Sequence, residues 1–143
     1  MSLLSLWEYT CDHPASIAFN LSDFMGRWYL QQQTIEPTNG SYKLYSCQTS
    51  DFVDADGDSF TLLNAYNYIT GSFGLGTGWN EFEGSCTSDG SCTFALTASF
   101  ATSDITAVPT NMTVIDTDYS SYAINYACDD STGYPRVWIF TRS

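Results

Sequence analysis

Few side chains in this sequence have the chemistry of a catalytic group, and their spacing forms no familiar active-site set. The single histidine, His13, follows Cys11 by two residues, a place where a surface residue is commoner than a general base. Glu81 and Glu83 lie two residues apart, so both face one side of a strand and could form a glycosidase-like carboxylate pair. An acidic outer face explains the same spacing, and we expect no enzyme.

The stretch "DFVDADGDSF" places four carboxylates around Gly57, namely Asp51, Asp54, Asp56 and Asp58. Groups of this kind can bind calcium. This stretch lacks the glutamate that closes an EF-hand loop, and it lies where two predicted strands need a hairpin turn. We expect no metal site.

Composition favours one globular domain with a strongly acidic surface. The chain has 143 residues, of which 16% are aromatic and 14% charged, whereas disordered chains are rich in charge and poor in aromatics. Sixteen carboxylates against four Lys and Arg residues give a formal net charge of −12. Such a field repels phosphate backbones, which argues against a nucleic acid partner.

Five cysteines and three Asn-x-Ser/Thr sites, at Asn20, Asn39 and Asn111, favour a secreted glycoprotein in an oxidising compartment. The opening "MSLLSLWEYTC" is too short and too polar for a signal peptide, so we expect a mature secreted chain. No apolar run approaches the ~20 residues that cross a bilayer, and no membrane span is expected.

Helical periodicity is hard to find in this sequence, so we expect strands to position the candidate residues. Alternating runs rich in Tyr, Phe, Val, Ile and Thr predict strands near 26–36, 42–53, 59–68, 77–84, 92–100, 111–117, 121–128 and 135–142. Turn signals such as "DADGD" and "TSDGS" separate them. About eight strands with short connections indicate an all-β antiparallel meander, which loses its exposed edges by closing into a barrel.

Three motifs in order resemble the signatures of the lipocalin family along nearly the full chain. "GRWY" at Gly26–Tyr29, preceded by Phe24, is similar to the first signature. "TDYSSYAINYAC", which includes Thr117, Asp118 and Tyr119, is similar to the second, and "WIFTRS" to the third. The resemblance implies a single lipocalin domain over 1–143, an eight-stranded up-and-down barrel over 24–143, and a segment 1–23 that crosses the closed end.

The resemblance also gives the signature residues structural roles. Gly26 lets the backbone bend into the barrel, and Trp28 closes its end. Arg142 would stack across the Trp28 indole, a cation–π contact worth about 1–2 kcal/mol. Arg27 points the opposite way by alternation and is expected in solvent.

Within the family, the chain resembles the branch of apolipoprotein D, insect bilin-binding proteins and crustacyanins. That branch implies a Cys11–Cys128 disulfide, and Cys86 with Cys92 would clip the hairpin around the turn "TSDGS". Cys47 is left unpaired, either buried and free or joined to another chain. One lipocalin branch uses a cysteine nucleophile, but no base lies near Cys47 in sequence. The family's C-terminal helix is expected to be missing, because the sequence stops directly after the last predicted strand; either the helix is absent or the sequence is incomplete.

The family implies a hydrophobic small molecule bound inside the barrel, with no cofactor required. Alternation of side chains along the strands predicts a pocket lined by Leu30, Gln32, Leu62, Asn64, Tyr66, Phe94, Leu96, Phe100, Tyr122, Ile124, Trp138 and Phe140. The register of the strand "FTLLNAYNYI" is the least determined, because it is apolar on both faces.

The branch includes carriers of carotenoids, bilins, sterols and fatty acids, and we favour a carotenoid or other long polyene. Gln32, Asn64 and tyrosine hydroxyls are the expected polar contacts. Related pigment carriers often pair, so homo- or hetero-oligomers are possible. The alternative is a secreted Tyr- and Trp-rich β-sandwich that binds glycans or builds an extracellular structure.

Overall fold

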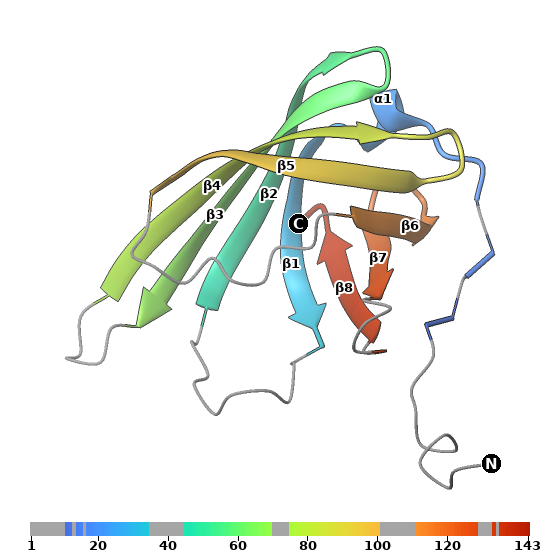
Figure 1. The fold of residues 1–143 in the computed structure, drawn as a ribbon. Coiled ribbons are helices and arrows are strands. Elements are labelled where there is room, and N and C mark those ends of the chain that lie inside the picture. The colour runs from blue at the N-terminus through green and yellow to red at the C-terminus, as the bar shows by residue number, and fades with distance from the viewer. Residues whose placement is uncertain are drawn as a thin grey trace, which may run out of the picture.

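The computed structural model describes residues 11–12, 14–15, 17–34, 45–69, 75–100, 111–128, 133 and 135–143. Eight antiparallel strands form one closed barrel in chain order (Figure 1). They are β1 (Gly26–Gln33), β2 (Tyr45–Asp56), β3 (Ser59–Ile69), β4 (Leu75–Cys86), β5 (Ser91–Phe100), β6 (Asn111–Thr117), β7 (Tyr122–Cys128) and β8 (Pro135–Thr141), preceded by the one-turn helix α1 (Leu21–Phe24). The predicted all-β barrel is confirmed, and a two-sheet sandwich is excluded.

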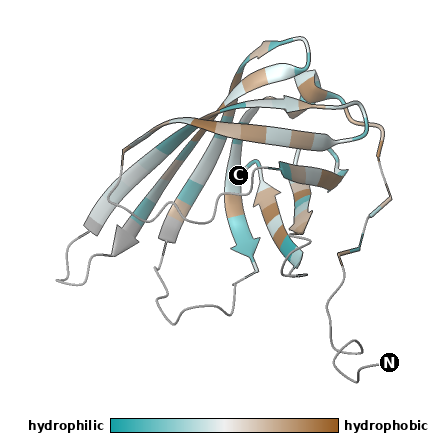
Figure 2. Ribbon diagram, viewed as in Figure 1, coloured by the Kyte–Doolittle hydropathy of each residue, from teal (hydrophilic) through white to brown (hydrophobic). Residues whose placement is uncertain are grey.

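Barrel closure comes from the pairing of the first strand with the last. Tyr29 pairs with Thr141 and Leu30 with Phe140. Apolar and polar residues alternate along several strands, as Figure 2 shows, because successive side chains of a strand point to opposite faces. No helix in the described part of the chain is long and apolar enough to cross a membrane.

The end of the barrel that carries the short turns is sealed by aromatic rings. Trp28 is 1% exposed, stacks on Phe24 at 5.0 Å, and donates a hydrogen bond from Nε1 to the Phe24 carbonyl at 2.9 Å. The Arg142 guanidinium lies 3.7 Å from the centre of the indole ring. Gly26 has a φ of +103°, and a Cβ there would lie 3.2 Å from Arg142 Nη1. Backbone and side chain therefore both require glycine at this bend.

Arg142 also satisfies backbone carbonyls that the chain leaves open at this end. Its guanidinium donates to the carbonyls of Arg27 at 3.1 Å, Asp23 at 3.2 Å and Tyr119 at 3.0 Å. Burial lowers the pKa of this group, and the Asp118 carboxylate partly opposes that effect. Arg27 instead faces solvent and forms a bidentate ion pair with Asp51. This is the division between the two arginines that the sequence predicts.

Two disulfides tie the described elements together. Cys11 pairs with Cys128 at the end of β7, which fastens the N-terminal segment to the barrel wall. Cys86 pairs with Cys92 across the β4–β5 hairpin. Further along the N-terminal segment, Phe19 and Leu21 are buried, and the Phe19 amide donates to the carbonyl of Ser88 in the β4–β5 turn at 2.9 Å. Residues 17–24 thus pack against the sealed end.

The turn between β6 and β7 is organised by one carboxylate. Asp118 accepts backbone hydrogen bonds from Ser120 at 3.1 Å, Ser121 at 2.8 Å and Tyr122 at 3.0 Å. It also accepts from the hydroxyl of Ser121. The Ser121 hydroxyl, followed by the amides of Tyr122 and Ser121, holds the pKa of Asp118 well below its usual range, because all of them favour the charged form.

Asp118→Asn is expected to lower the melting temperature at pH 7. A carboxyl whose pKa is depressed on folding stabilises the fold above its unfolded pKa, which is about 3.9, and loses that contribution as the pH falls toward the folded value. The difference between the parent and the variant should therefore shrink below about pH 4. Thermal melts from pH 7 to pH 2.5 measure it, with Asp56→Asn in the exposed hairpin as control. A difference that is constant over this range contradicts the prediction.

Candidate functional site: the barrel interior

Strand register and burial identify the inner face of the barrel. On β2, β3 and β4 buried apolar side chains form ladder partners: Phe52 pairs with Leu62, and Leu62 with Phe82. The same alternation, followed from strand to strand, gives the inner row. Its members are Trp28, Leu30, Ser50, Phe52, Phe60, Leu62, Asn64, Tyr66, Asn80, Phe82, Phe94, Leu96, Val114, Ala123, Asn125, Ala127, Trp138 and Phe140.

The half of the interior next to the sealed end is packed core. Phe52 and Phe60 lie with ring centres 5.3 Å apart, and Phe60 and Phe94 lie 5.9 Å apart. A Cβ on Gly84 would come within 2.6 Å of the Phe60 ring, so these rings fill the space that small inner residues leave. The predicted pocket residues Leu62, Phe94 and Phe140 belong to this core, with exposures of 6%, 9% and 6%.

The other half of the interior is less tightly covered. Leu30, Tyr66 and Trp138 are half-buried, and Leu96 on the inner face of β5 is 50% exposed. The exposure of Leu96 has a structural cause. In the described pairing, β5 meets β6 only through Ser91, Cys92 and Thr93, so the wall beside Leu96 has no β6 partner. Apolar side chains therefore border an accessible part of the barrel.

Neutral polar groups lie on the inner walls between these two halves. The Ser50 hydroxyl donates to Asn64 Oδ1 at 2.7 Å. Asn80, paired with Asn64, is 4% exposed, and Asn125, paired with Val114 and Trp138, is 1% exposed. The Oδ1 atoms of Asn80 and Asn125 have no hydrogen-bond partner in the structure. Buried acceptors of this kind cost about 1–3 kcal/mol each when unmet, so they are sites at which a donor atom would be stabilised.

Comparison with known proteins agrees with this architecture. No family model matches the chain, and no curated protein matches its sequence. Insecticyanin from the tobacco hornworm Manduca sexta superposes with a TM-score of 0.65 at 18% identity, covering 96% of this chain and 71% of that chain. This chain has the lipocalin fold.

Two further lipocalin structures give similar values. Lobster apocrustacyanin A1 has a TM-score of 0.56 at 18% identity, over 94% of this chain and 74% of that chain. Japanin from Rhipicephalus appendiculatus, whose structure holds cholesterol, has a TM-score of 0.58 at 11% identity, over 91% of this chain and 78% of that chain. At these sequence identities, the structural similarity shows a shared fold alone.

Four of the predicted pocket residues lie elsewhere in the lipocalin barrel, and two of these errors have one cause. A β-bulge is an extra residue in one strand, and it reverses which face the following side chains take. Thr97 is the extra residue in β5, so Phe100 pairs with Trp79 on the outer face instead of pointing inward. Gln31 is the extra residue in β1, so Gln32 pairs with Ile139 on the outer face, and Gln33 takes the inner position opposite Trp138.

The other two errors concern Tyr122 and Ile124, which were expected to face inward because they are the larger side chains of their strand. In β7 the buried residues are Ala123, Asn125 and Ala127, so the smaller side chains face inward. Ala123 is fully buried and pairs with the buried Phe140 of β8. Tyr122 lies on the outer face, where its hydroxyl donates to Asp116 at 3.2 Å. Partial burial, followed by that hydrogen bond, raises the pKa of Tyr122.

The inner amides of Asn80 and Asn125 were not predicted from the sequence, although the position of Asn80 could have been inferred. If Glu81 and Glu83 form an acidic outer face, then Asn80 and Phe82 must alternate inward. The structure places both glutamates on the outer face of β4, opposite Leu63 and Thr61. Asn125 carried no such signal. It shares one strand face with Ala123 and Ala127, and a polar residue among small ones is typical of a surface position.

The remaining candidate residues that the structure describes lie outside the barrel interior. The structure describes no group of three or more His, Cys, Asp or Glu residues able to hold a metal, and Asp51 is paired with Arg27. Asn20 is exposed and caps α1, and Asn111 is exposed at the start of β6. His13 and Asn39 lie outside the described residues.

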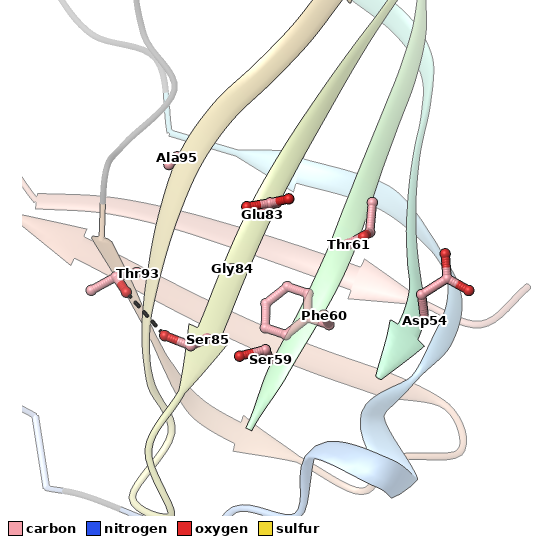
Figure 3. A pocket seen from close by; sticks show the side chains of 9 residues that line it. All are labelled: Asp54, Ser59, Phe60, Thr61, Glu83, Gly84, Ser85, Thr93 and Ala95. Atoms are coloured by element: carbon pink, nitrogen blue, oxygen red, sulfur yellow. Dashed lines mark hydrogen bonds between the residues drawn. The ribbon is translucent and has the colours of Figure 1, made fainter. Parts of the chain in front are cut away.

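A depression of about 490 Å³ lies on the outer face of β3, β4 and β5, near the sealed end (Figure 3). Its lining combines polar and apolar groups and includes Asp54, Thr61, Glu83, Ser85 and Thr93. Most of these side chains belong to the face opposite Leu62 and Phe82, although Phe60 of the inner row also lines the depression.

Cys47 is exposed and has no disulfide partner, so of the two expected states the buried one is wrong. It lies in an irregular stretch of β2 with a φ of +55°. An accessible thiol should react with a disulfide reagent in the native protein. We expect one equivalent of thiol per folded chain from 5,5′-dithiobis(2-nitrobenzoate) and none from Cys47→Ser. No reaction before denaturation would contradict the exposed position, and a reducible dimer would show that Cys47 joins two chains.

Proposed function

We propose that this chain is a secreted carrier that holds a small hydrophobic molecule inside its barrel. The observation that carries the proposal is the accessible inner half, bordered by Leu30, Tyr66, Leu96 and Trp138 above a packed aromatic base. Apolar walls with a few placed polar groups are typical of small-molecule sites. Japanin, which has the same fold, holds cholesterol, and this supports a ligand of comparable size here.

The inner polar groups favour a neutral ligand that carries a hydroxyl group. Ser50, Asn64, Asn80 and Asn125 are uncharged, and the last two offer unmet acceptors. A ligand donor that reached such an acceptor would gain a hydrogen bond in a place of low polarity. An oxygenated polyene of the carotenoid type is the ligand we favour, with a sterol as the alternative.

Secretion is part of the proposal because of the cross-links and the glycan acceptors. Two disulfides are expected in an oxidising compartment and are rare in the cytosol. Asn20 and Asn111 are both exposed, so either side chain is accessible for attachment of a glycan.

The direct experiment is native mass spectrometry of the protein from its natural source, followed by an absorbance scan of the solvent extract. A bound apolar molecule of a few hundred daltons would support the carrier, and visible absorption would identify a polyene or bilin. The proposal would be overturned if the natural protein is empty and the folded chain also fails to bind all-trans-retinol and dehydroergosterol.

Leu96→Arg should weaken binding of all-trans-retinol and of dehydroergosterol at least tenfold. Leu96 faces inward, and a buried leucine contributes about 1.5–3 kcal/mol, while an arginine there would bring an unpaired charge toward the ligand. Leu63→Arg is the matched control, because Leu63 is 37% exposed on the outer face of β3 and should leave both affinities within twofold. Ligand fluorescence measures both. Equal losses in the two variants would place the binding site outside the barrel.

A further inference from the structure

The outer face of β3, β4 and β5 carries an apolar patch. Trp79 and Phe100 are 44% and 65% exposed, and their rings stack at 6.4 Å with an interplanar angle of 14°. Trp79 also pairs with Ala65, and the next rung toward the sealed end joins Leu63, Glu81 and Ala98. We define the outer patch as Leu63, Ala65, Trp79, Ala98 and Phe100. Clustered exposed aromatics are uncommon on a surface that has only to remain soluble.

Local structure holds this patch in place. Without the extra residue Thr97, alternation would direct Phe100 into the barrel. The bulge is fixed by the Thr97 hydroxyl, which donates to the backbone carbonyl of Glu81 at 3.1 Å. The same hydroxyl lies 3.4 Å from Glu81 Oε2, so the carboxylate stays beside the patch. The exposure of Phe100 is therefore determined by the strand geometry.

The charge of this face has one sign. Glu81 lies between Leu63 and Ala98, and Glu83 occupies the next outer position on β4. Beyond Glu83, the outer depression is also bordered by Asp54 (Figure 3). The strands Ser59–Ile69, Leu75–Cys86 and Ser91–Phe100 contain no lysine or arginine. The face therefore combines an aromatic pair with carboxylates that no cation of its own three strands neutralises.

We propose that this face docks a basic segment of a partner protein. Arginine side chains would pair with Glu81 and Glu83, and a guanidinium or an apolar neighbour would stack on Trp79 and Phe100. Charge complementarity selects this partner. A second copy of the chain would bring the same acidic face and another net charge of −12, which opposes self-association.

The test uses a fluorescein-labelled peptide of four Arg-Leu repeats and a matching peptide of four Glu-Leu repeats. Fluorescence anisotropy at 150 mM salt should show binding of the basic peptide only. Phe100→Ser and Glu81→Gln should each weaken it at least fivefold, while both variants keep the circular dichroism spectrum of the parent. Asp116→Asn on β6 removes the same charge as Glu81→Gln and should change the affinity less than twofold.

Three outcomes would overturn the proposal. The basic peptide fails to bind, the acidic peptide binds equally well, or the patch variants bind as the parent does. Sedimentation supplies a further check: self-association that Phe100→Ser abolishes would assign the face to a second copy of the chain. Retinol binding is independent of these results, because the outer patch and the inner row lie on opposite faces of the wall.

Discussion

Trp28→Ala is expected to lower the free energy of unfolding by about 3–5 kcal/mol, the range for a large aromatic removed from a packed core. Trp28 is 1% exposed, it stacks on Phe24, and the Arg142 guanidinium covers its ring. The substitution removes both contacts and leaves a cavity at the sealed end. Urea unfolding followed by circular dichroism measures the loss.

Trp79→Ala is the matched control for this prediction. It is also a tryptophan on a strand, but 44% exposed on the outer face. Its loss should change the free energy of unfolding by less than about 1 kcal/mol, as surface substitutions usually do. Similar effects from the two tryptophans would show that the sealed end contributes no more to stability than the outer patch.

Removing the Cys11–Cys128 disulfide is expected to destabilise the fold by about 4 kcal/mol, and removing Cys86–Cys92 by about half as much. The first bridge spans 117 residues and the second spans 6. A cross-link that closes a longer loop excludes more conformations of the unfolded chain. Paired Cys→Ser substitutions, compared in urea, give the two values.

The order of these effects distinguishes two physical accounts. If the short bridge matters as much as the long one, the disulfides act through native packing at the β4–β5 hairpin more than through the unfolded chain. Because the Cys11→Ser/Cys128→Ser variant keeps all eight strands, its circular dichroism spectrum at low urea should match that of the parent. An unfolded variant without urea would mean a loss larger than predicted.

The sequence predicted the fold well because its strongest signals are local and strand-specific. Seven turn segments and alternating runs gave eight strands whose observed bounds differ from the expected ones by a few residues. The roles of Gly26, Trp28 and Arg142 could be predicted because these residues match the lipocalin signatures, and the structure shows the expected contact between Trp28 and Arg142. The pairing of Cys11 with Cys128 came from the resemblance alone and is present in the structure.

The pocket was harder to predict, because alternation shows which face of the barrel a side chain takes only while the strand has no bulge. The extra residues Gln31 and Thr97 moved Gln32 and Phe100 to the outer face, and nothing in their sequence context marks a bulge. In β7 the inward side chain is Ala123, which pairs with the buried Phe140 of β8, and that pairing joins two strands. Such information is absent from any single strand, and it is why Tyr122 and Ile124 were assigned to the wrong side.

The Cys11–Cys128 bridge also defines the covalent connectivity of the molecule after a backbone cut. It makes residues 11–128 a closed ring, so one nick anywhere within it leaves a single piece under non-reducing conditions. β8 lies outside that ring and is attached through residues 129–134 alone. A cut there would leave the last strand held by non-covalent contacts: its pairing with β1 and β7, the burial of Phe140 in the core, and the contacts of Arg142 with Trp28 and with backbone carbonyls. The barrel is therefore suited to complementation, in which a synthetic strand replaces the final one and reassembly reports on closure of the barrel.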